Sequence, residues 1–156
     1  MDLQIDRVDI DSVAPADNII IAACPCTMIL LIWERVVPLL ELPIALAHGE
    51  VTINTLKQKL LRGEALLITV SRGADIIAVN TVEVRHFESG LKALYIPLIG
   101  GTEMEEWMDR FLNIVSAIGK DLGCTEFRGI AARKGWIRKL KPRGWSEVST
   151  IIKCDI

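Results

Sequence analysis

The stretch "YIPLIGGTEMEEWM" (residues 95–108) contains a β-prone run, two adjacent glycines and the beginning of a helix. A strand that leads through glycines into a helix is a common way to bind a phosphate. The first helical N–H groups lack partners there, and the helix dipole attracts negative charge. However, Glu103, Glu105 and Glu106 open this helix, and their carboxylates would repel an anion. The stretch therefore predicts a strand–turn–helix unit and leaves two roles open for the turn, phosphate binding or a purely structural one.

Pro97 lies inside the strand of this unit. Proline has no N–H to donate to a sheet ladder, so a central strand accommodates it only at a bulge or where pairing has ended. We therefore expect this strand to separate from a neighbour near Pro97, which would leave a wedge-shaped gap between two strands.

Upstream of the unit, short turns separate three β-prone runs, which predicts an antiparallel meander. The runs are "ALLITVS" (65–71), "DIIAVNTVEVRHF" (75–87) and "KALYIPLI" (92–99). Downstream, apolar residues recur at helical spacing over residues 103–122, and Gly123 is suited to end that helix. The apolar stripe consists of Met104, Trp107, Met108, Phe111, Val115, Ile118 and Leu122.

The remaining elements complete an α+β domain. Further strands are predicted at 3–10, 18–23, 125–131 and 145–155, and a basic helix at 134–142. Two helices are predicted within residues 27–63. Their expected boundaries are Thr27 as N-cap, Pro38 and Pro43 as stop or kink, Thr52 or Asn54 as second N-cap, and Gly63 as C-terminal stop.

The length of 156 residues fits one domain spanning 1–156, with the sheet and the C-terminal half within 64–156. The composition is 51% hydrophobic and 24% charged, as in globular proteins, and the net charge of −2 does not favour nucleic-acid binding. Cys24 and Cys26 are spaced too closely for a zinc site, so we expect no metal. The apolar stretch 19–33 is too short to span a bilayer and follows acidic residues, which predicts a cytoplasmic protein without membrane contact.

Basic residues are concentrated in the C-terminal part, where seven of the 18 Lys and Arg residues fall within 128–143. They are Arg128, Arg133, Lys134, Arg138, Lys139, Lys141 and Arg143. Such a cluster suits an adenosine 3′-phosphate, a nucleic acid or an acidic partner, and it is also compatible with a solvated helix face.

The element order, with glycines between the third meander strand and the long helix, resembles the GNAT superfamily of acyl-CoA-dependent N-acetyltransferases. The most specific match is "GCTEFRGIAARKGWIRKLKPRGW" (123–145). Many GNAT chains carry Asn-x-x-Ala here, then Tyr and Gly-Phe at four-residue steps. Arg133 falls at the Asn position, Trp136 at the Ala, Leu140 at the Tyr and Gly144-Trp145 at the Gly-Phe. The stretch also resembles small GNAT-like proteins encoded by tailed bacteriophages.

The resemblance implies a mainly antiparallel sheet with a splayed strand pair, helices on both faces, and acetyl-CoA as cofactor. The pantetheine arm would bond to the backbone of the strand around 95–99, and the diphosphate would bind the turn and the next helix. The implied cofactor-binding residues are Ile96, Leu98, Ile99, Gly100, Gly101, Thr102, Arg133 and Arg138.

Acetyl transfer to an amine requires a base for the ammonium proton and an acid for the departing thiolate. Glu83 and His86 on the second meander strand are the candidate bases. The family's usual acid is a tyrosine at the position of Leu140, which leaves Tyr95, the only tyrosine in the chain, as candidate acid.

Two functions follow from these features. The first is acetyl transfer from acetyl-CoA to the amine of a small molecule or protein. The second is a catalytically inactive GNAT-fold structural or assembly protein of a tailed-phage virion, which acts through phage proteins or self-association. The absence of an Arg or Gln before the glycines, the absent helix tyrosine, and the acidic and basic helices favour the second.

Overall fold

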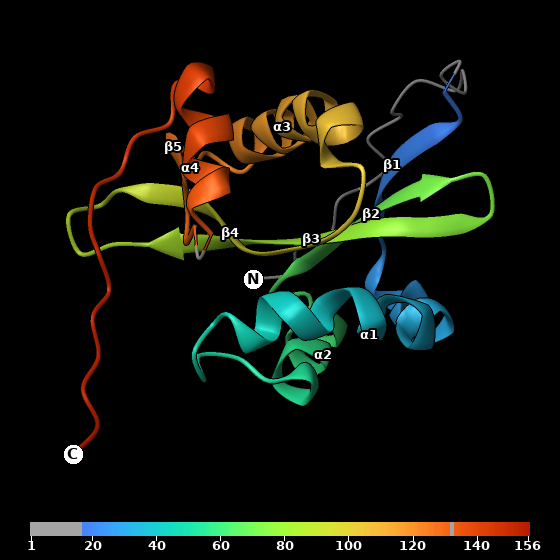
Figure 1. The fold of residues 1–156 in the computed structure, drawn as a ribbon, viewed down its shortest axis with the longest axis horizontal. Helices are drawn as coiled ribbons and strands as arrows, with labels where there is room; N and C mark the ends of the chain where they lie inside the picture. The colour runs from blue at the N-terminus through green and yellow to red at the C-terminus, as the bar shows by residue number, and fades with distance from the viewer. Residues whose placement is uncertain (1–16, 132) are drawn as a thin grey trace.

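Five strands form one sheet in the computed structural model, which describes residues 17–131 and 133–156 (Figure 1). They are β1 (Ile19–Cys24), β2 (Leu66–Arg72), β3 (Asp75–His86), β4 (Lys92–Gly101) and β5 (Glu126–Gly129), in that spatial order. Strands β1 to β4 pair antiparallel, which confirms the predicted meander, and β5 runs parallel to β4. The strand predicted at 3–10 lies outside the described residues.

Helices cover both faces of the sheet, as predicted (Figure 1). α1 (Ile29–Ala45) and α2 (Ile53–Leu61) lie on one face, and α3 (Met104–Asp121) lies on the other. A 3₁₀ turn, η1 (Cys26–Met28), precedes α1, and α4 (Lys134–Leu140) with the 3₁₀ turn η2 (Lys141–Arg143) follows β5. Thr52 caps α2 through a reciprocal pair of hydrogen bonds with Thr55, so it, and not Asn54, is the N-cap.

Three sequence predictions about the elements are wrong. Thr27 does not cap α1, because it lies inside η1. Of the two effects predicted for Pro38 and Pro43, a stop or a kink, the stop is wrong: α1 continues to Ala45 because its apolar face stays packed on the sheet beyond both prolines. The last predicted strand, 145–155, has an extended backbone without any partner strand among the described residues.

Each helical layer has its own apolar core against the sheet. The α3 side contains the predicted stripe, with Trp107 and Phe111 in an edge-to-face contact at 5.9 Å between ring centroids. On the other side, Leu40 of α1 and Leu60 of α2 are buried against Leu67 of β2. Burying a leucine side chain fully contributes about 1.5–3 kcal/mol to the free energy of folding. The packing of both helical layers therefore stabilises the sheet.

A β-bulge reverses the orientation of side chains along β4. Glu83 lies opposite Tyr95 and Thr81 lies opposite Leu98, so that two β4 residues, Ile96 and Pro97, face the single β3 residue between them. Ile96, the first residue of the bulge, packs in the α3 core, whereas Leu98, directly after the bulge, packs under α1 and α2. This change in the side-chain alternation places Gly100, two residues after Leu98, against α1.

Gly100 permits this close contact between β4 and α1. A Cβ atom at Gly100 would lie 1.9 Å from the carbonyl oxygen of Leu39 and 3.0 Å from the ring of Pro43. Pro43 is four residues after Leu39 and has no N–H for that carbonyl. The proline in the helix and the glycine in the strand therefore meet at one contact between the two elements.

We predict that Gly100→Ala lowers the free energy of unfolding by about 1–3 kcal/mol, because α1 must move away from β4 to admit the methyl group. Urea denaturation measures this change. Gly135→Ala is the matched control: no atom lies within 4 Å of its added Cβ, and alanine favours the helix, so its unfolding midpoint stays equal or rises. An unchanged midpoint for Gly100→Ala would contradict the close contact.

Candidate active site

A cavity of about 480 Å³ lies where β4 ends and α3 begins. Its lining comes from residues 99–107 and from Arg133, Trp136 and Lys139 on α4 and its N-cap. Four consecutive predicted residues, Ile99, Gly100, Gly101 and Thr102, and also Arg133, are brought together here. The side chains of Ile96 and Leu98 are buried in opposite cores, and Arg138 does not line the cavity.

The edge of β4 is open beside this cavity. The parallel pairing with β5 ends at Ile96 opposite Gly129, one residue before Pro97, which confirms the expected separation. The N–H of Thr102 donates to the carbonyl of Ile77 on β3 at 3.0 Å. Because backbone groups alternate along an antiparallel ladder, the N–H and C=O of Ile99 point the other way, toward the open edge.

The turn between β4 and α3 is held rigidly. Gly101 has a φ of +123°, and a Cβ atom there would lie 2.3 Å from the Ile77 carbonyl, so the structure itself requires this glycine. The indole Nε1–H of Trp107 donates to the Thr102 carbonyl at 2.8 Å. Among the described residues, the N–H groups of residues 103–105 donate no hydrogen bond, so the first turn of α3 presents unused donors.

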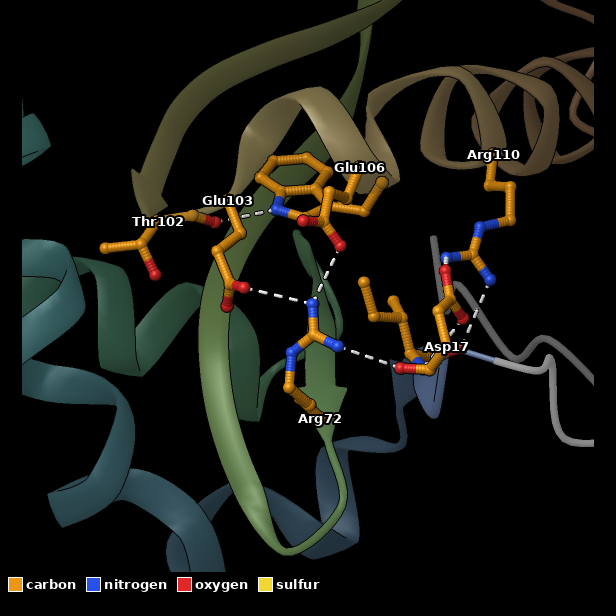
Figure 2. Close-up of polar contacts among 8 residues, drawn as sticks. Asp17, Arg72, Thr102, Glu103, Glu106 and Arg110 are labelled. Atoms are coloured by element: carbon orange, nitrogen blue, oxygen red, sulfur yellow. Dashed lines mark hydrogen bonds and ion pairs between the residues drawn. The ribbon is translucent and has the colours of Figure 1, made fainter.

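The glutamates at the start of α3 are paired with cations. Arg72, the last residue of β2, lies 3.0 Å from the Glu103 carboxylate and 2.8 Å from that of Glu106 (Figure 2). Lys139 of α4 lies 2.7 Å from Glu105, and its hydrogen bond lowers the pKa of that carboxyl group. The carboxylates therefore complement the helix dipole while Arg72 and Lys139 offset their charge.

A second ion pair joins α3 to η2, the 3₁₀ turn that follows α4. Arg143 lies 2.6 Å from Asp109 of α3, and its hydrogen bond lowers the pKa of Asp109. Together with Lys139 and Glu105, this pair attaches the basic segment to the acidic side of α3 within one chain. These acidic and basic residues therefore pair within one chain, and the hypothesis that the two helices serve contacts between copies stays a prediction.

Two of the three predicted catalytic residues lie together on the face covered by α1 and α2. Glu83 and Tyr95 are directly opposite across β3 and β4. Arg85 donates to one Glu83 oxygen at 2.8 Å, and Lys59 to the other at 3.2 Å. His86, at an odd separation from Glu83 along the strand, lies on the other sheet face and is exposed.

Tyr95 is kept protonated by its surroundings. The side chain is largely buried, and this burial raises the pKa of Tyr95. The Arg85 guanidinium lies 3.4 Å from the centroid of the Tyr95 ring, and the same arginine hydrogen-bonds Glu83. At neutral pH the arrangement therefore presents a tyrosine hydroxyl as a proton donor next to a carboxylate.

Sequence reasoning missed three cations of the site, Arg72, Lys59 and Arg85, and it named Lys139 in the basic cluster without pairing it with Glu105. One signal was available. Glu105 and Asp109 are four residues apart on α3, and their partners Lys139 and Arg143 are also four residues apart. Matching acidic and basic spacings of one helical turn indicate two helices that pair side by side.

The described residues contain neither a metal-binding cluster nor a helix suited to cross a membrane. No three His, Cys, Asp or Glu residues within 17–131 and 133–156 gather in a metal-binding arrangement. In the same part of the chain, no helix combines the length and apolar character that crossing a membrane requires.

No protein-family model and no curated protein sequence matches this chain. Solved structures of acetyltransferases do match its fold. An aminoglycoside acetyltransferase, meta-AAC0020 from an uncultured soil metagenomic sample in complex with sisomicin, is 12% identical, with a TM-score of 0.63 over 89% of this chain and 97% of that one. The ribosomal-protein-alanine N-acetyltransferase of Brucella melitensis is 14% identical, with a TM-score of 0.63 over 88% and 99%.

A third structure, aminoglycoside N-acetyltransferase AAC(6′)-Iy in complex with CoA, is 14% identical, with a TM-score of 0.65 over 92% of this chain and 98% of that one. At such identities the likeness concerns the fold, which is that of GNAT acetyltransferases. The narrower resemblance to phage-encoded proteins stays a prediction.

The ion pairs between α3 and α4 predict a pH-dependent contribution to stability. The lowered pKa values of Glu105 and Asp109 mean that this contribution is complete above their ordinary values of 4.5 and 3.8 and is lost as the pH falls. We expect the variant Glu105→Gln/Asp109→Asn to melt below the wild type at pH 7, and the difference to shrink as the pH falls below those ordinary values.

Thermal unfolding followed by circular dichroism between pH 7 and pH 3 measures this difference. Glu88→Gln is the control, because the described residues contain no ion pair to Glu88. A difference that stayed constant over this pH range would refute the electrostatic origin.

Proposed function

We propose that this chain binds acyl-CoA in the cleft between β4, α3 and α4 and transfers the acyl group to an amine. The observation that carries the proposal is the open edge of β4 beyond Ile96, which runs directly into the cavity at the start of α3. A strand edge with unused amide groups suits the amides of a pantetheine arm, and unused N–H groups at a helix start suit a diphosphate.

The residues around the cavity fit such a ligand. Residues 103–105 offer the N–H groups, and Arg133 and Lys139 supply cationic side chains on the facing wall. Counted together, Arg72, Arg133 and Lys139 balance the three glutamates of the helix start. The acidic residues therefore do not make the cavity repulsive to an anion, which answers the objection that the sequence raised.

The chain's own groups would handle the protons of the transfer. Acyl-CoA, when bound, supplies a thioester. Tyr95 lies four residues before Ile99, or about 13 Å along the strand, and is still paired with Arg128 of β5 just before the open edge begins. We assign its hydroxyl the role of proton donor to the departing thiolate, and Glu83 the role of acceptor for the amine proton.

The acceptor is proposed to be an amine on the basis of the fold neighbours. Two of them are named as aminoglycoside acetyltransferases and one as an acetyltransferase of a ribosomal-protein alanine. In this chain the acceptor would approach from the side of α1 and α2, where Glu83, Arg85 and Tyr95 lie.

A second candidate is acyl-CoA binding without transfer. Both carboxylate oxygens of Glu83 already accept hydrogen bonds from cations, Arg85 and Lys59. Leu140 also stands where the resemblance implies a tyrosine acid. Such a protein would bind the cofactor and show no turnover. The phage assembly alternative gains no support, since the helices that suggested it pair with each other.

We predict that CoA at 100 times its Kd stabilises the protein by about 2.7 kcal/mol, a melting-temperature rise of several degrees. Arg133→Glu is expected to abolish most of this shift because it places a carboxylate in the cavity wall. Arg138→Glu is the matched control, since it makes the same change on the same helix outside the cavity. Gly101 is unsuitable as a test site because the fold itself requires it.

No shift with millimolar CoA, or equal loss in both variants, would sink the proposed cofactor site. The measurement uses differential scanning fluorimetry with the same protein and CoA concentrations for all three proteins. The melting temperatures without CoA show whether either substitution disturbs the fold.

We further predict that Tyr95→Phe and Glu83→Gln each lower kcat about 100-fold or more, while the CoA-induced thermal shift is retained. Phe keeps the ring beneath Arg85, so packing is preserved. Acetylated product is measured by mass spectrometry with a panel of aminoglycosides, polyamines and peptides. His86→Gln is the control and retains activity. Binding without product in the wild type would select the non-catalytic candidate.

A further inference from the structure

Two arginines lie over aromatic rings in the region of the proposed proton-transfer residues. The Arg85 guanidinium lies 3.4 Å from the centroid of the Tyr95 ring. The Arg128 guanidinium, from β5, lies 4.4 Å from the centroid of the Phe87 ring. Both distances are within the range at which the face of an aromatic ring attracts a cation. Each ring therefore holds its guanidinium in position before a ligand arrives.

The strand register places Arg128 beside Tyr95. Across the three strands β3, β4 and β5, Glu83 lies opposite Tyr95, which in turn lies opposite Arg128. Phe127, the residue before Arg128, packs in the core under α3, so Arg128 is directed to the opposite face, which Tyr95 shares. Neighbouring strands are about 5 Å apart, so the backbones of Glu83 and Arg128 lie about 10 Å apart with Tyr95 between them.

Both guanidinium groups retain N–H donors. Arg128 donates through Nε to the Glu126 carboxylate at 2.9 Å, and its two Nη atoms have no partner among the described residues. Arg85 uses Nε and Nη2 for Glu83, which leaves its Nη1 without a partner in the same part of the chain. The two side chains are 36% and 42% exposed, so a ligand can reach them from solvent. Positioned guanidinium donors suit a compact oxyanion.

Charges of both signs surround Tyr95. Burial raises the pKa of Tyr95, and nearby charges act on it as well: Arg85 lowers it, whereas Glu50 and Glu83 raise it. The register puts Glu83 and Arg128 on opposite sides of Tyr95. A molecule that lies across Tyr95 therefore meets a carboxylate at one end and a guanidinium at the other.

We propose that the acceptor is a zwitterion, an amine that also carries a carboxylate several bonds away, and that Arg128 binds this carboxylate. The inference rests on the proposed transfer, in which Glu83 accepts the amine proton. Arg85 and Arg128 each pair already with a glutamate, so little net positive charge remains, which suits a singly charged carboxylate better than a phosphate. A purely cationic amine would place a like charge against Arg128 and bind more weakly.

Three amines of equal length test this inference. ε-Aminocaproate, its amide and hexamethylenediamine carry a negative, a neutral and a positive group at the far end. For the wild type we expect kcat/KM to be at least about tenfold higher with ε-aminocaproate than with the other two, the effect of one hydrogen bond to a charged group. Arg128→Gln is expected to remove this preference through a higher KM at nearly constant kcat, and Arg128→Lys to keep part of it. Lys120→Gln is the matched control: it removes a positive charge from α3, on the other face of the sheet, and keeps the preference.

Binding supplies a readout that does not depend on turnover. Isothermal titration calorimetry in the presence of CoA measures the Kd of the three amines for the wild type and each variant. A tenfold preference for ε-aminocaproate that Arg128→Gln abolishes supports the inference even without product, in which case only the proposed transfer fails.

The opposite results separate the two proposals as well. Equal affinity for the acid and its amide, no binding of the acid, or equal losses in Arg128→Gln and Lys120→Gln would overturn the zwitterionic acceptor. The CoA-induced thermal shift and acetylation of the amide would then still uphold the proposed function. Melting temperatures without ligand show that the variants fold, as expected for partly exposed side chains outside both cores.

Discussion

The β-bulge that sets Ile96 and Pro97 against a single residue of β3 is the constraint on which the rest of the structure depends. Proline cannot donate to the ladder on either side, so regular pairing fails at this position. On the β3 side the failure shifts the phase of β4 and brings Gly100 under α1. On the β5 side the pairing ends at Ile96, which exposes the strand edge beside the cavity. The contact of Gly100 with α1 and the open edge of β4 therefore have the same cause.

Charge pairing explains the residues that looked least compatible with a phosphate site. Glutamates at a helix start are favourable for the dipole, yet they would oppose an anionic ligand if left alone. Here Arg72 reaches them from β2 and Lys139 from α4, so the same carboxylates join three elements around the turn. A diphosphate would compete for cations that are already in place. The proposed site thus combines a structural ion-pair network with unused N–H donors at the start of α3.

The sequence predicted most of the fold because its strongest signals are local. The meander, the α3 stripe and the separation at Pro97 follow from periodicity and from backbone chemistry. The predicted stop of α1 at its prolines was wrong because tertiary packing keeps the helix continuous through Pro38 and Pro43. In the candidate site, the turn was predicted from the chain order, and Arg133 from the resemblance to the GNAT superfamily. The cations around Glu83 and Glu103 were not, since Lys59 and Arg72 reach them from distant segments and only the folded register brings them together.

The geometry at Pro97 also bears on the C-terminal segment 145–155. Because β4 turns away from β5 after Ile96, β5 gains only four paired residues and ends at Gly129. A strand this short gives its own C-terminal segment little edge to pair with, although the sequence of that segment has a clear two-residue alternation. The divergence that opens the edge of β4 therefore also leaves the alternating segment 145–155 without a partner strand among the described residues.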